Sequence, residues 1–377
     1  MKNSRVLLLA LIILALLQVF VGITVADEWD EEENNEATVP LPVPVEESPI
    51  IEVAQEPKPL NIFVRPQYKL SDFYREIFVI VTIVTYILNY IMGKRANEKI
   101  ARKWMETHYQ LFAENFAQVG NDKGNALIMD GPADYLFYLT GRRNCQYIHG
   151  RITLKPRHDL LQTITNFIMS QFSSNYIVDS VTYHAYMNDK DYDDFVFALT
   201  KKEKAGDLRK SRYDLGDFTR QSNSNLLPNA MNLHSESLEI TDTILTNKVV
   251  ELVKTITKYL NAVIITDQPR IRPEKSIENR QKLITIISEL PNSSSKFEET
   301  IPVSELLMFL IDWVPSKCTF RGETKAKITK NREEAEKKIQ KGLEYERQEA
   351  IQQKKAEKKR AEAERVAKLS PEEQRKM

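Results

Sequence analysis

The sequence predicts a single-pass membrane protein of type I, with a mixed α+β (α/β) cytosolic domain followed by a long charged helix. Two apolar runs near the N-terminus, Val6–Leu17 and Ile77–Met92, predict how the chain meets the membrane. After Phe320 the composition changes to one dominated by Lys, Glu and Arg. The formal net charge of the 377 residues is zero, so neither sign is in excess. Acidic and basic residues nevertheless concentrate in different segments of the chain.

Residues 1–26 have the layout of a secretory signal peptide. Lys2 and Arg5 precede the apolar run, and short side chains up to Ala26 provide a cleavage point. An uncleaved signal anchor is the alternative. Either form directs the chain to the membrane of the endoplasmic reticulum.

Residues 27–72 are acidic and rich in proline, and they predict a disordered luminal segment. Like charges and low hydrophobicity bury too little apolar surface to offset the entropy of the chain. Flexible carboxylates bind calcium weakly, so one acidic run is a candidate calcium site. A solubilising tail is the alternative. The candidate side chains are Asp27, Glu28, Asp30, Glu31, Glu32, Glu33 and Glu36.

Residues 73–93 predict a transmembrane helix. The run Ile77–Met92 carries no charge, and its 16 residues would span about 24 Å as a helix. Lys94, Arg95 and further basic residues follow directly, which places that end in the cytosol and the N-terminus in the lumen. A buried core helix is the alternative. Asn89, the strongly polar side chain of the run, is a candidate contact with a partner helix; a tolerated amide at the interface is its alternative.

Residues 94–319 predict the cytosolic globular domain, although the pattern does not determine a strand order. We expect a helix over 96–120, strands in ALIMDG, DYLFYLTG and YIHGRITL, and a helix from His158 with Leu161, Ile164, Ile168 and Phe172 on one face. The stretch SESLEITDTILTNKVVELVKTITKYL predicts a strand or turn that leads into a long helix, and AVIITD and KLITIISEL predict strands. A closing helix follows, with Ser304 as its N-cap.

Residues 320–377 predict a basic, coiled-coil-like helical tail with 18 Lys and Arg against 12 Asp and Glu from Arg321 onward. Its apolar stripe of Ile328, Ala335, Ile339, Leu343 and Ala350 is too irregular for a sustained coiled coil, so we expect a partly exposed helix. A second basic segment, 201–220, predicts a loop. Both could contact RNA or anionic lipid; a solvated surface is the alternative. The candidates are Lys354, Lys355, Lys358, Lys359, Arg360, Lys201, Lys202, Arg209, Lys210 and Arg212.

No catalytic constellation is visible. The sequence lacks the glycine-rich phosphate-binding motifs and the H-E-x-x-H zinc motif, and its five histidines have no ligand spacing. Cys145 near His149 would suggest a nucleophile and a base, but a buried structural cysteine is the commoner case. We therefore expect a protein that is not an enzyme and requires no cofactor. An unrecognised membrane enzyme would need a deep polar pocket within residues 96–318.

Three stretches, GKRANEKIARKW, DYLFYLTGRRNC and SLEITD, occur in order between the apolar run and the charged tail. In this arrangement the chain resembles the calumin family, the coiled-coil-domain endoplasmic reticulum protein of the PAT complex. The resemblance implies an intramembrane chaperone, formed with the small membrane partner Asterix beside the Sec translocon and the other multipass translocon subunits. It further implies contact with nascent multipass proteins and the ribosome, and a link of the luminal segment to calcium binding and calcium homeostasis.

The function that follows from the resemblance is assistance in inserting and folding multipass proteins at the rough endoplasmic reticulum. The tail would contact ribosomal RNA through phosphates, because tethering raises its effective concentration there. The alternative is a low-affinity luminal calcium-binding protein. One departure concerns the tail, which is commonly longer in the family and here stops at LSPEEQRKM, either because it is shorter or because the sequence is truncated.

Overall fold

The computed structural model describes residues 73–368, except 122–123, 173–175, 189–191, 223 and 274–279. The predicted signal peptide, the acidic segment with its seven calcium candidates, and the last nine residues of the tail lie outside the described residues.

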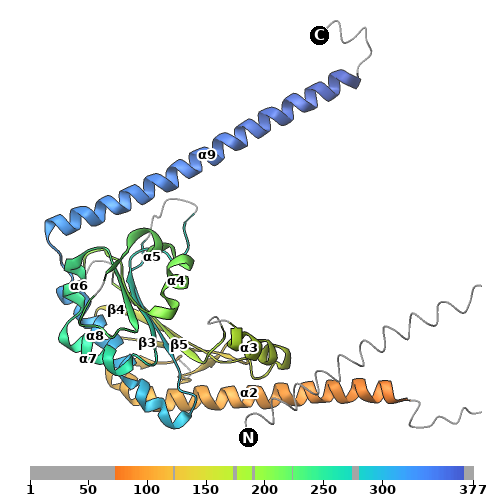
Figure 1. Ribbon diagram of the computed structural model, residues 1–377, viewed down its shortest axis with the longest axis vertical. Coiled ribbons are helices and arrows are strands. Elements are labelled where there is room, and N and C mark those ends of the chain that lie inside the picture. Colours follow the sequence, from red (N-terminus) through yellow and green to blue (C-terminus); the bar gives the residue numbers. More distant parts are fainter. Residues whose placement is uncertain are drawn as a thin grey trace, which may run out of the picture. The chain divides into compact units, whose positions relative to one another are not determined.

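Helix α2, Tyr74–Asn115, joins the predicted transmembrane segment and the predicted helix over 96–120 into one helix of 42 residues (Figure 1). Its apolar first half is exposed, as at Ile80 and Met92, whereas its second half buries Trp104 and Phe112. Within the described residues, α2 is the one helix long and apolar enough to cross a membrane. This fits the prediction of a single-pass membrane protein.

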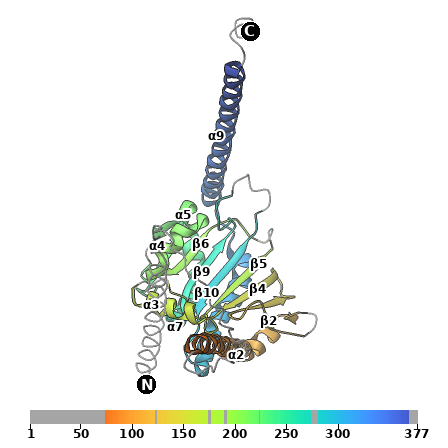
Figure 2. The same cartoon turned by 90° about the vertical axis from the view of Figure 1, so that its right-hand side faces the viewer.

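A ten-stranded antiparallel sheet forms the centre of the domain (Figure 2). Its strands follow the order β1-β3-β4-β5-β10-β9-β6-β8-β7, and β2 pairs with β3 at one edge. Because neighbouring strands pair antiparallel throughout, the domain is of the α+β kind and not α/β. The strands are β1 Gln118–Val119, β2 Ile128–Met129, β3 Asp134–Thr140, β4 Cys145–Thr153, β5 Ser180–Met187, β6 Phe197–Lys201, β7 Arg220–Ser222, β8 Met231–Ser235, β9 Leu260–Thr266 and β10 Leu283–Glu289.

The remaining helices depart from the expectations at three places. The basic segment predicted as a loop forms two short helices. The stretch SESLEITD, predicted as a strand or turn, ends a strand at Ser235 and then enters a short helix at Leu238, and the long helix predicted to follow it is divided where Thr246 caps a new helix. Ser304 does not cap its helix; it is buried within it and hydrogen-bonds to Tyr183 at 2.8 Å. The helices are α3 Leu160–Phe172, α4 Lys202–Ser211, α5 Tyr213–Phe218, α6 Leu238–Ile244, α7 Asn247–Ile256, the 3-10 helix η2 Ser294–Thr300, α8 Ile301–Lys317 and α9 Gly322–Lys368.

One face of the sheet packs against the second half of α2 and against α6, α7 and α8 to form the main core. Alternate residues of β3, including Phe137, point into this core. The ring of Phe137 lies 5.4 Å from that of Trp104 on α2 and 5.8 Å from that of Tyr183 on β5. Gly150 pairs with Phe137 across β3 and β4, and a Cβ there would lie 2.0 Å from the ring, so only glycine fits.

The opposite face is covered over only part of its width. A smaller core joins β6 and β9 to α5 and the start of α9 through Ala198, Ile264, Phe218 and Ala335. Over β3, β4 and β5 this face remains partly exposed. There Tyr138, His149 and His184 stack across three strands, with ring centroids 5.0 Å and 6.2 Å apart.

The charged helix α9 begins as part of the domain. Ile328, Ala335 and Ile339, which belong to the predicted apolar stripe, are buried. Leu343 is half-buried, and every described side chain from Glu344 to Ala361 is exposed. The expected partly exposed helix therefore has a first part packed on the domain and a second part in solvent.

Candidate membrane-proximal site and basic surfaces

One side of α2 carries a polar stripe where its apolar run ends. Asn89, Gly93 and Asn97 follow one another at intervals of four residues and so lie on one face of the helix. The amide Nδ2 of Asn89 donates to the carbonyl oxygens of Arg157 at 3.5 Å and His158 at 3.2 Å. A Cβ on Gly93 would lie 2.2 Å from the Arg157 oxygen, so the glycine permits this close approach.

The same segment is also held by a partly buried ion pair. The Arg157 guanidinium donates two bonds to the Asp179 carboxylate, at 2.9 Å and 2.6 Å, and a third to Asn97 Oδ1 at 3.0 Å. Burial by itself would raise the pKa of Asp179, but the bonds from Arg157 and the Lys155 backbone outweigh it and lower that pKa. We call Asn89, Gly93, Asn97, Arg157 and Asp179 the membrane-proximal junction.

The junction changes the interpretation of Asn89. Sequence reasoning offered it as a contact with a partner helix inside the membrane. Its amide donors are instead used within the chain, by the segment that leads into α3. A contact of Asn89 with a partner helix stays a prediction. Hydrogen bonds across 68 and 69 residues leave no local signal in the sequence that would have revealed them.

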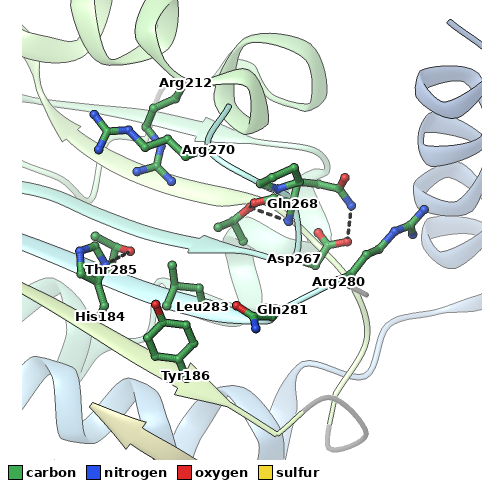
Figure 3. Close-up of a pocket in the computed structure, with 12 residues that line it drawn as sticks. His184, Tyr186, Arg212, Asp267, Gln268, Arg270, Arg280, Gln281, Leu283 and Thr285 are labelled. Carbon is green, nitrogen blue, oxygen red and sulfur yellow. Dashed lines mark hydrogen bonds between the residues drawn. The ribbon is translucent and has the colours of Figure 1, made fainter. Parts of the chain in front are cut away.

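A polar cavity of about 270 Å³ opens on the partly covered face of the sheet (Figure 3). Arg212, Arg270 and Arg280 contribute positive charge, and His184 Nδ1 hydrogen-bonds to Thr285 Oγ1 at 3.1 Å. Burial and the neighbouring His149, Arg212 and Arg270 lower the pKa of His184 to about 4, which keeps the imidazole neutral at pH 7. The cavity therefore combines three arginines with the carboxylate of Asp267, and among the described residues that line it there is no cysteine or serine to act as a nucleophile.

The two cysteines are not activated. Burial raises the pKa of Cys145 to about 11 and that of Cys318 to about 12. The Cys145 thiol donates to the carbonyl oxygens of Tyr147 and Tyr186, each at 3.4 Å, and His149 stacks on Tyr138 instead. Among the described residues, no group of three or more His, Cys, Asp and Glu side chains is placed to hold a metal ion.

The basic candidates between Lys201 and Arg212 are not equivalent. Lys202 and Lys210 are exposed, whereas Lys201 lies 3.7 Å from Glu203 and is half-buried. Arg209 is half-buried and donates to the Thr219 carbonyl at 3.4 Å. The last candidate is unsuitable as a surface contact: Arg212 is 5% exposed, and its guanidinium pairs with Asp214 at 2.8 Å and 3.0 Å.

The basic candidates of the tail are all exposed on α9. They are Lys354, Lys355, Lys358, Lys359 and Arg360, and their spacing places them on more than one side of the helix. They lie beyond the part of α9 that packs on the domain. The structure does not bring them together with the basic candidates between Lys201 and Arg212 in any described contact.

Comparison with known proteins assigns the chain to a family. The family model described as PAT complex subunit CCDC47 matches residues 72–377. The human PAT complex subunit CCDC47 is 27% identical over 362 residues, which cover 89% of this chain and 72% of that protein. A protein of Schizosaccharomyces pombe, named as an endoplasmic reticulum membrane protein, is 30% identical over 69% of this chain and 73% of its own.

Among solved structures, the mycobacterial trehalose monomycolate transport factor A matches 49% of this chain and 70% of its own, at 8% identity and a TM-score of 0.23. That similarity is too slight to inform the fold. The family model, by contrast, covers most of the sequence and every described residue. This confirms the resemblance seen in GKRANEKIARKW, DYLFYLTGRRNC and SLEITD, and the chain belongs to the family of PAT complex subunit CCDC47.

Proposed function

We propose that this protein is a non-enzymatic subunit of an intramembrane chaperone, the PAT complex, at the ribosome-bound Sec translocon of the endoplasmic reticulum. Membership of the family supports the complex, and the name of the Schizosaccharomyces pombe relative supports the compartment. In this proposal the N-terminus is luminal, and the domain with its tail is cytosolic. The basic residues from Lys94 onward support that orientation.

One observation carries the proposal most directly: α2 passes without interruption from an exposed apolar half into the core of the domain. The helix is therefore fixed in orientation by Trp104 and Phe112, and its apolar half presents side chains such as Ile83 and Leu88 to its surroundings. These side chains would contact the transmembrane helices of clients and of an Asterix-like partner. Association in the membrane depends on such packing surfaces and not on a hydrophobic driving force.

The ribosome contact is proposed for the exposed half of α9. Lys354, Lys358 and their basic neighbours point into solvent, where they can bind the phosphates of ribosomal RNA without reading a base sequence. A truncation at Phe320 would be a poor test, because it removes Ile328 and Arg332 from the domain. The better variant keeps the full chain and replaces Lys354, Lys355, Lys358, Lys359 and Arg360 by Gln.

Co-sedimentation of the detergent-solubilised full chain with purified ribosomes over a salt series tests this contact. We expect the wild type to pellet, the five-Gln variant to pellet less, and the salt dependence to weaken with each phosphate contact removed. Lys202→Gln with Lys210→Gln is the matched control on the domain. Equal pelleting of the wild type and the five-Gln variant would assign the contact elsewhere.

The chaperone role is tested by site-specific photo-crosslinking from Ile83 on the exposed apolar half of α2. Ribosome-bound nascent chains of a multipass protein should form adducts, and those of a secreted protein should not. Position 105 on the same helix is the control, because Met105 is buried in the domain. Adducts from neither class of nascent chain at position 83 would contradict a client-contacting α2.

The calcium-binding alternative depends on residues 27–36 alone, whose acidic side chains lie outside the described residues. Equilibrium dialysis of the full chain against calcium tests it. Replacement of the seven acidic residues by their amides should abolish saturable uptake at millimolar calcium if this segment is the site.

A further inference from the structure

The orientation of α3 is the reverse of that of an ordinary surface helix: its polar side faces the domain and its apolar side faces outward. In a soluble domain, the apolar side of an amphipathic helix faces the core and the polar side faces water. Along Leu160–Phe172, the polar residues Gln162, Thr163, Asn166 and Ser170 fall on one side of the helix. The opposite side carries Leu161, Ile164, Ile168 and Phe172 and is interrupted by Thr165, and none of the thirteen residues is buried.

The polar side attaches α3 to the rest of the domain. Thr163 Oγ1 donates to the carbonyl oxygen of Pro156 at 2.8 Å. Asn166 forms two hydrogen bonds with Ile177, donating to its carbonyl at 2.9 Å and accepting from its N–H at 2.6 Å. The helix is therefore held by polar side chains, which leaves its apolar side directed away from these contacts.

The apolar side is exposed to an extent that is unusual for large aliphatic and aromatic side chains. Leu161 is 72% exposed and Phe172 is 86% exposed, while Phe167, Ile168 and Met169 are each between 45% and 49% exposed. A contiguous apolar surface of this kind marks a contact with a protein or a membrane.

The position of α3 identifies its surroundings. His158, two residues before the helix, accepts a hydrogen bond from Asn89 and stacks edge-on against Tyr90, with ring centroids 5.9 Å apart. Both partners lie within the apolar run of α2. Because 16 residues of helix span less than the ~30 Å hydrocarbon core, neither end of that run can lie far from the lipid. The helix α3 therefore starts at the membrane boundary.

We propose that α3 is an interfacial membrane helix, with Leu161, Ile168 and Phe172 inserted among the lipids of the leaflet on the domain's side. This goes beyond the proposed chaperone function and rests on one part of it, the crossing of the membrane by α2. A phospholipid surface fits better than a protein groove for two reasons. The segment that leads into α3 is attached through His158 to Asn89 and Tyr90 in the apolar run of α2, and the exposed apolar residues spread along the whole length of α3, from Leu161 to Phe172.

The composition of α3 predicts how the contact should depend on the charge of the lipid headgroups. Amphipathic interfacial helices commonly add the attraction of Lys and Arg for anionic headgroups to the burial of apolar area. No residue from Leu160 to Phe172 is charged. The contact should therefore depend on apolar burial alone, and it should be the same in neutral and anionic bilayers and at low and high salt.

The test uses the full chain in phosphatidylcholine proteoliposomes with an environment-sensitive fluorophore on a single introduced cysteine. The variants are Phe172→Cys on α3, Ile83→Cys on α2 as the membrane reference, and Asp207→Cys on the exposed side of α4 as the matched control. Cys145 and Cys318 can stay, because both are buried and their raised pKa values leave little reactive thiolate.

Nitroxide-labelled phosphatidylcholine then reports contact with lipid. We expect the label at position 172 to lose most of its emission, as the label at 83 does, while the label at 207 keeps its emission. Adding phosphatidylserine or salt should not change the loss of emission from the label at position 172. Quenching at 83 without quenching at 172 overturns the proposal, and blue-shifted but unquenched emission at 172 would indicate a protein surface instead. No quenching at 83 would remove the membrane crossing and the proposal with it.

Discussion

Arg332 on α9 and Asp267, directly after β9, form a buried bidentate ion pair. The Arg332 guanidinium donates from Nη2 to one carboxylate oxygen at 2.6 Å and from Nε to the other at 2.8 Å. The same guanidinium donates two bonds of 3.1 Å to Glu236, and the side chains of all three residues are at most 4% exposed. The charged helix is thus attached to the domain by a charge cluster that excludes water.

We expect Arg332→Ala to destabilise the domain by about 3–5 kcal/mol. The variant leaves the Asp267 and Glu236 carboxylates buried without their cation, and an unpaired buried charge costs far more than a surface ion pair contributes. Urea unfolding of the detergent-solubilised chain, followed by tryptophan fluorescence, measures the change.

Lys330, two residues before Arg332, provides the matched control. The Lys330 side chain is 75% exposed and its pair with Glu334 is 4.0 Å long, so Lys330→Ala should change stability by less than about 0.5 kcal/mol. Similar effects of the two substitutions would mean that the Arg332 cluster contributes no more than a surface pair.

A second prediction concerns acid. His184 has a pKa of about 4 in the folded protein and about 6.5 in an unfolded chain. Between these values the unfolded chain binds a proton that the folded protein does not, so the stability due to neutral His184 is complete above about pH 6.5 and is lost as the pH falls toward 4. The difference in melting temperature between wild type and His184→Gln should therefore shift against the wild type below about pH 6.

The comparison with His184→Gln is needed because other histidines shift in the same direction. Burial lowers the pKa of His108 and of His234, so the wild type should lose stability in acid for several reasons. The difference between the two proteins isolates His184 together with its coupling to His149, which stacks on it and whose pKa burial also lowers. A difference that stays constant from about pH 7 to pH 5 would show that its imidazole is not held neutral.

The elements that could be predicted from sequence are those in which buried and exposed residues alternate with a regular period within the segment itself. In DYLFYLT, Tyr135, Phe137 and Leu139 are buried and their neighbours are half-exposed, which is the period of two that predicted a strand. The exposed apolar run of α2 could also be predicted from the sequence, because the lack of charge over Ile77–Met92 is a property of the segment itself. The acidic segment and the signal peptide lie outside the described residues and stay predictions.

The elements that could not be predicted depend on contacts between distant residues. Arg332 meets Glu236 and Asp267 across 96 and 65 residues, and in a sequence rich in Lys, Glu and Arg it is indistinguishable from an exposed arginine. Gly206 suggested a loop, yet a Cβ there would meet nothing within 4 Å, and helix α4 continues through it. The apolar face of α3 was predicted correctly as a stripe, but its outward direction is set by the hydrogen bonds of Asn166.

A third prediction tests the close approach at the membrane-proximal junction. In Gly93→Ala the new methyl group would lie 2.2 Å from the backbone oxygen of Arg157, which cannot move aside as a side chain would. We expect a loss of stability of about 1–3 kcal/mol from overpacking. Gly206→Ala is the matched control in open space and should be neutral or stabilising by up to about 1 kcal/mol, as glycine is unfavourable within a helix. Equal changes in stability for Gly93→Ala and Gly206→Ala would mean that α2 and the Arg157 backbone are not in close contact at Gly93.

The fourth prediction decides what Asn89 does. Asn89→Leu removes the donor to the carbonyl oxygens of Arg157 and His158, each bond contributing on the order of 1 kcal/mol. The segment before α3 should loosen, and trypsin should cleave the Arg157–His158 bond faster in detergent. Thr85→Val is the matched control in the same helix, because the Thr85 hydroxyl bonds only to the carbonyl of Val81 at 2.8 Å.

Recovery of membrane partners in mild detergent, measured on the same samples, separates the two roles of Asn89. If cleavage after Arg157 rises and partner recovery stays at the wild-type level, the amide acts within the chain, as its hydrogen bonds to the α3 segment indicate. If recovery falls while cleavage is unchanged, the amide contacts a partner helix, as the sequence alone predicted. The second result would mean that the Asn89 side chain leaves the Arg157 carbonyl when the partner binds. That exchange is feasible, because the bond to Arg157 is long at 3.5 Å and the side chain is only partly buried.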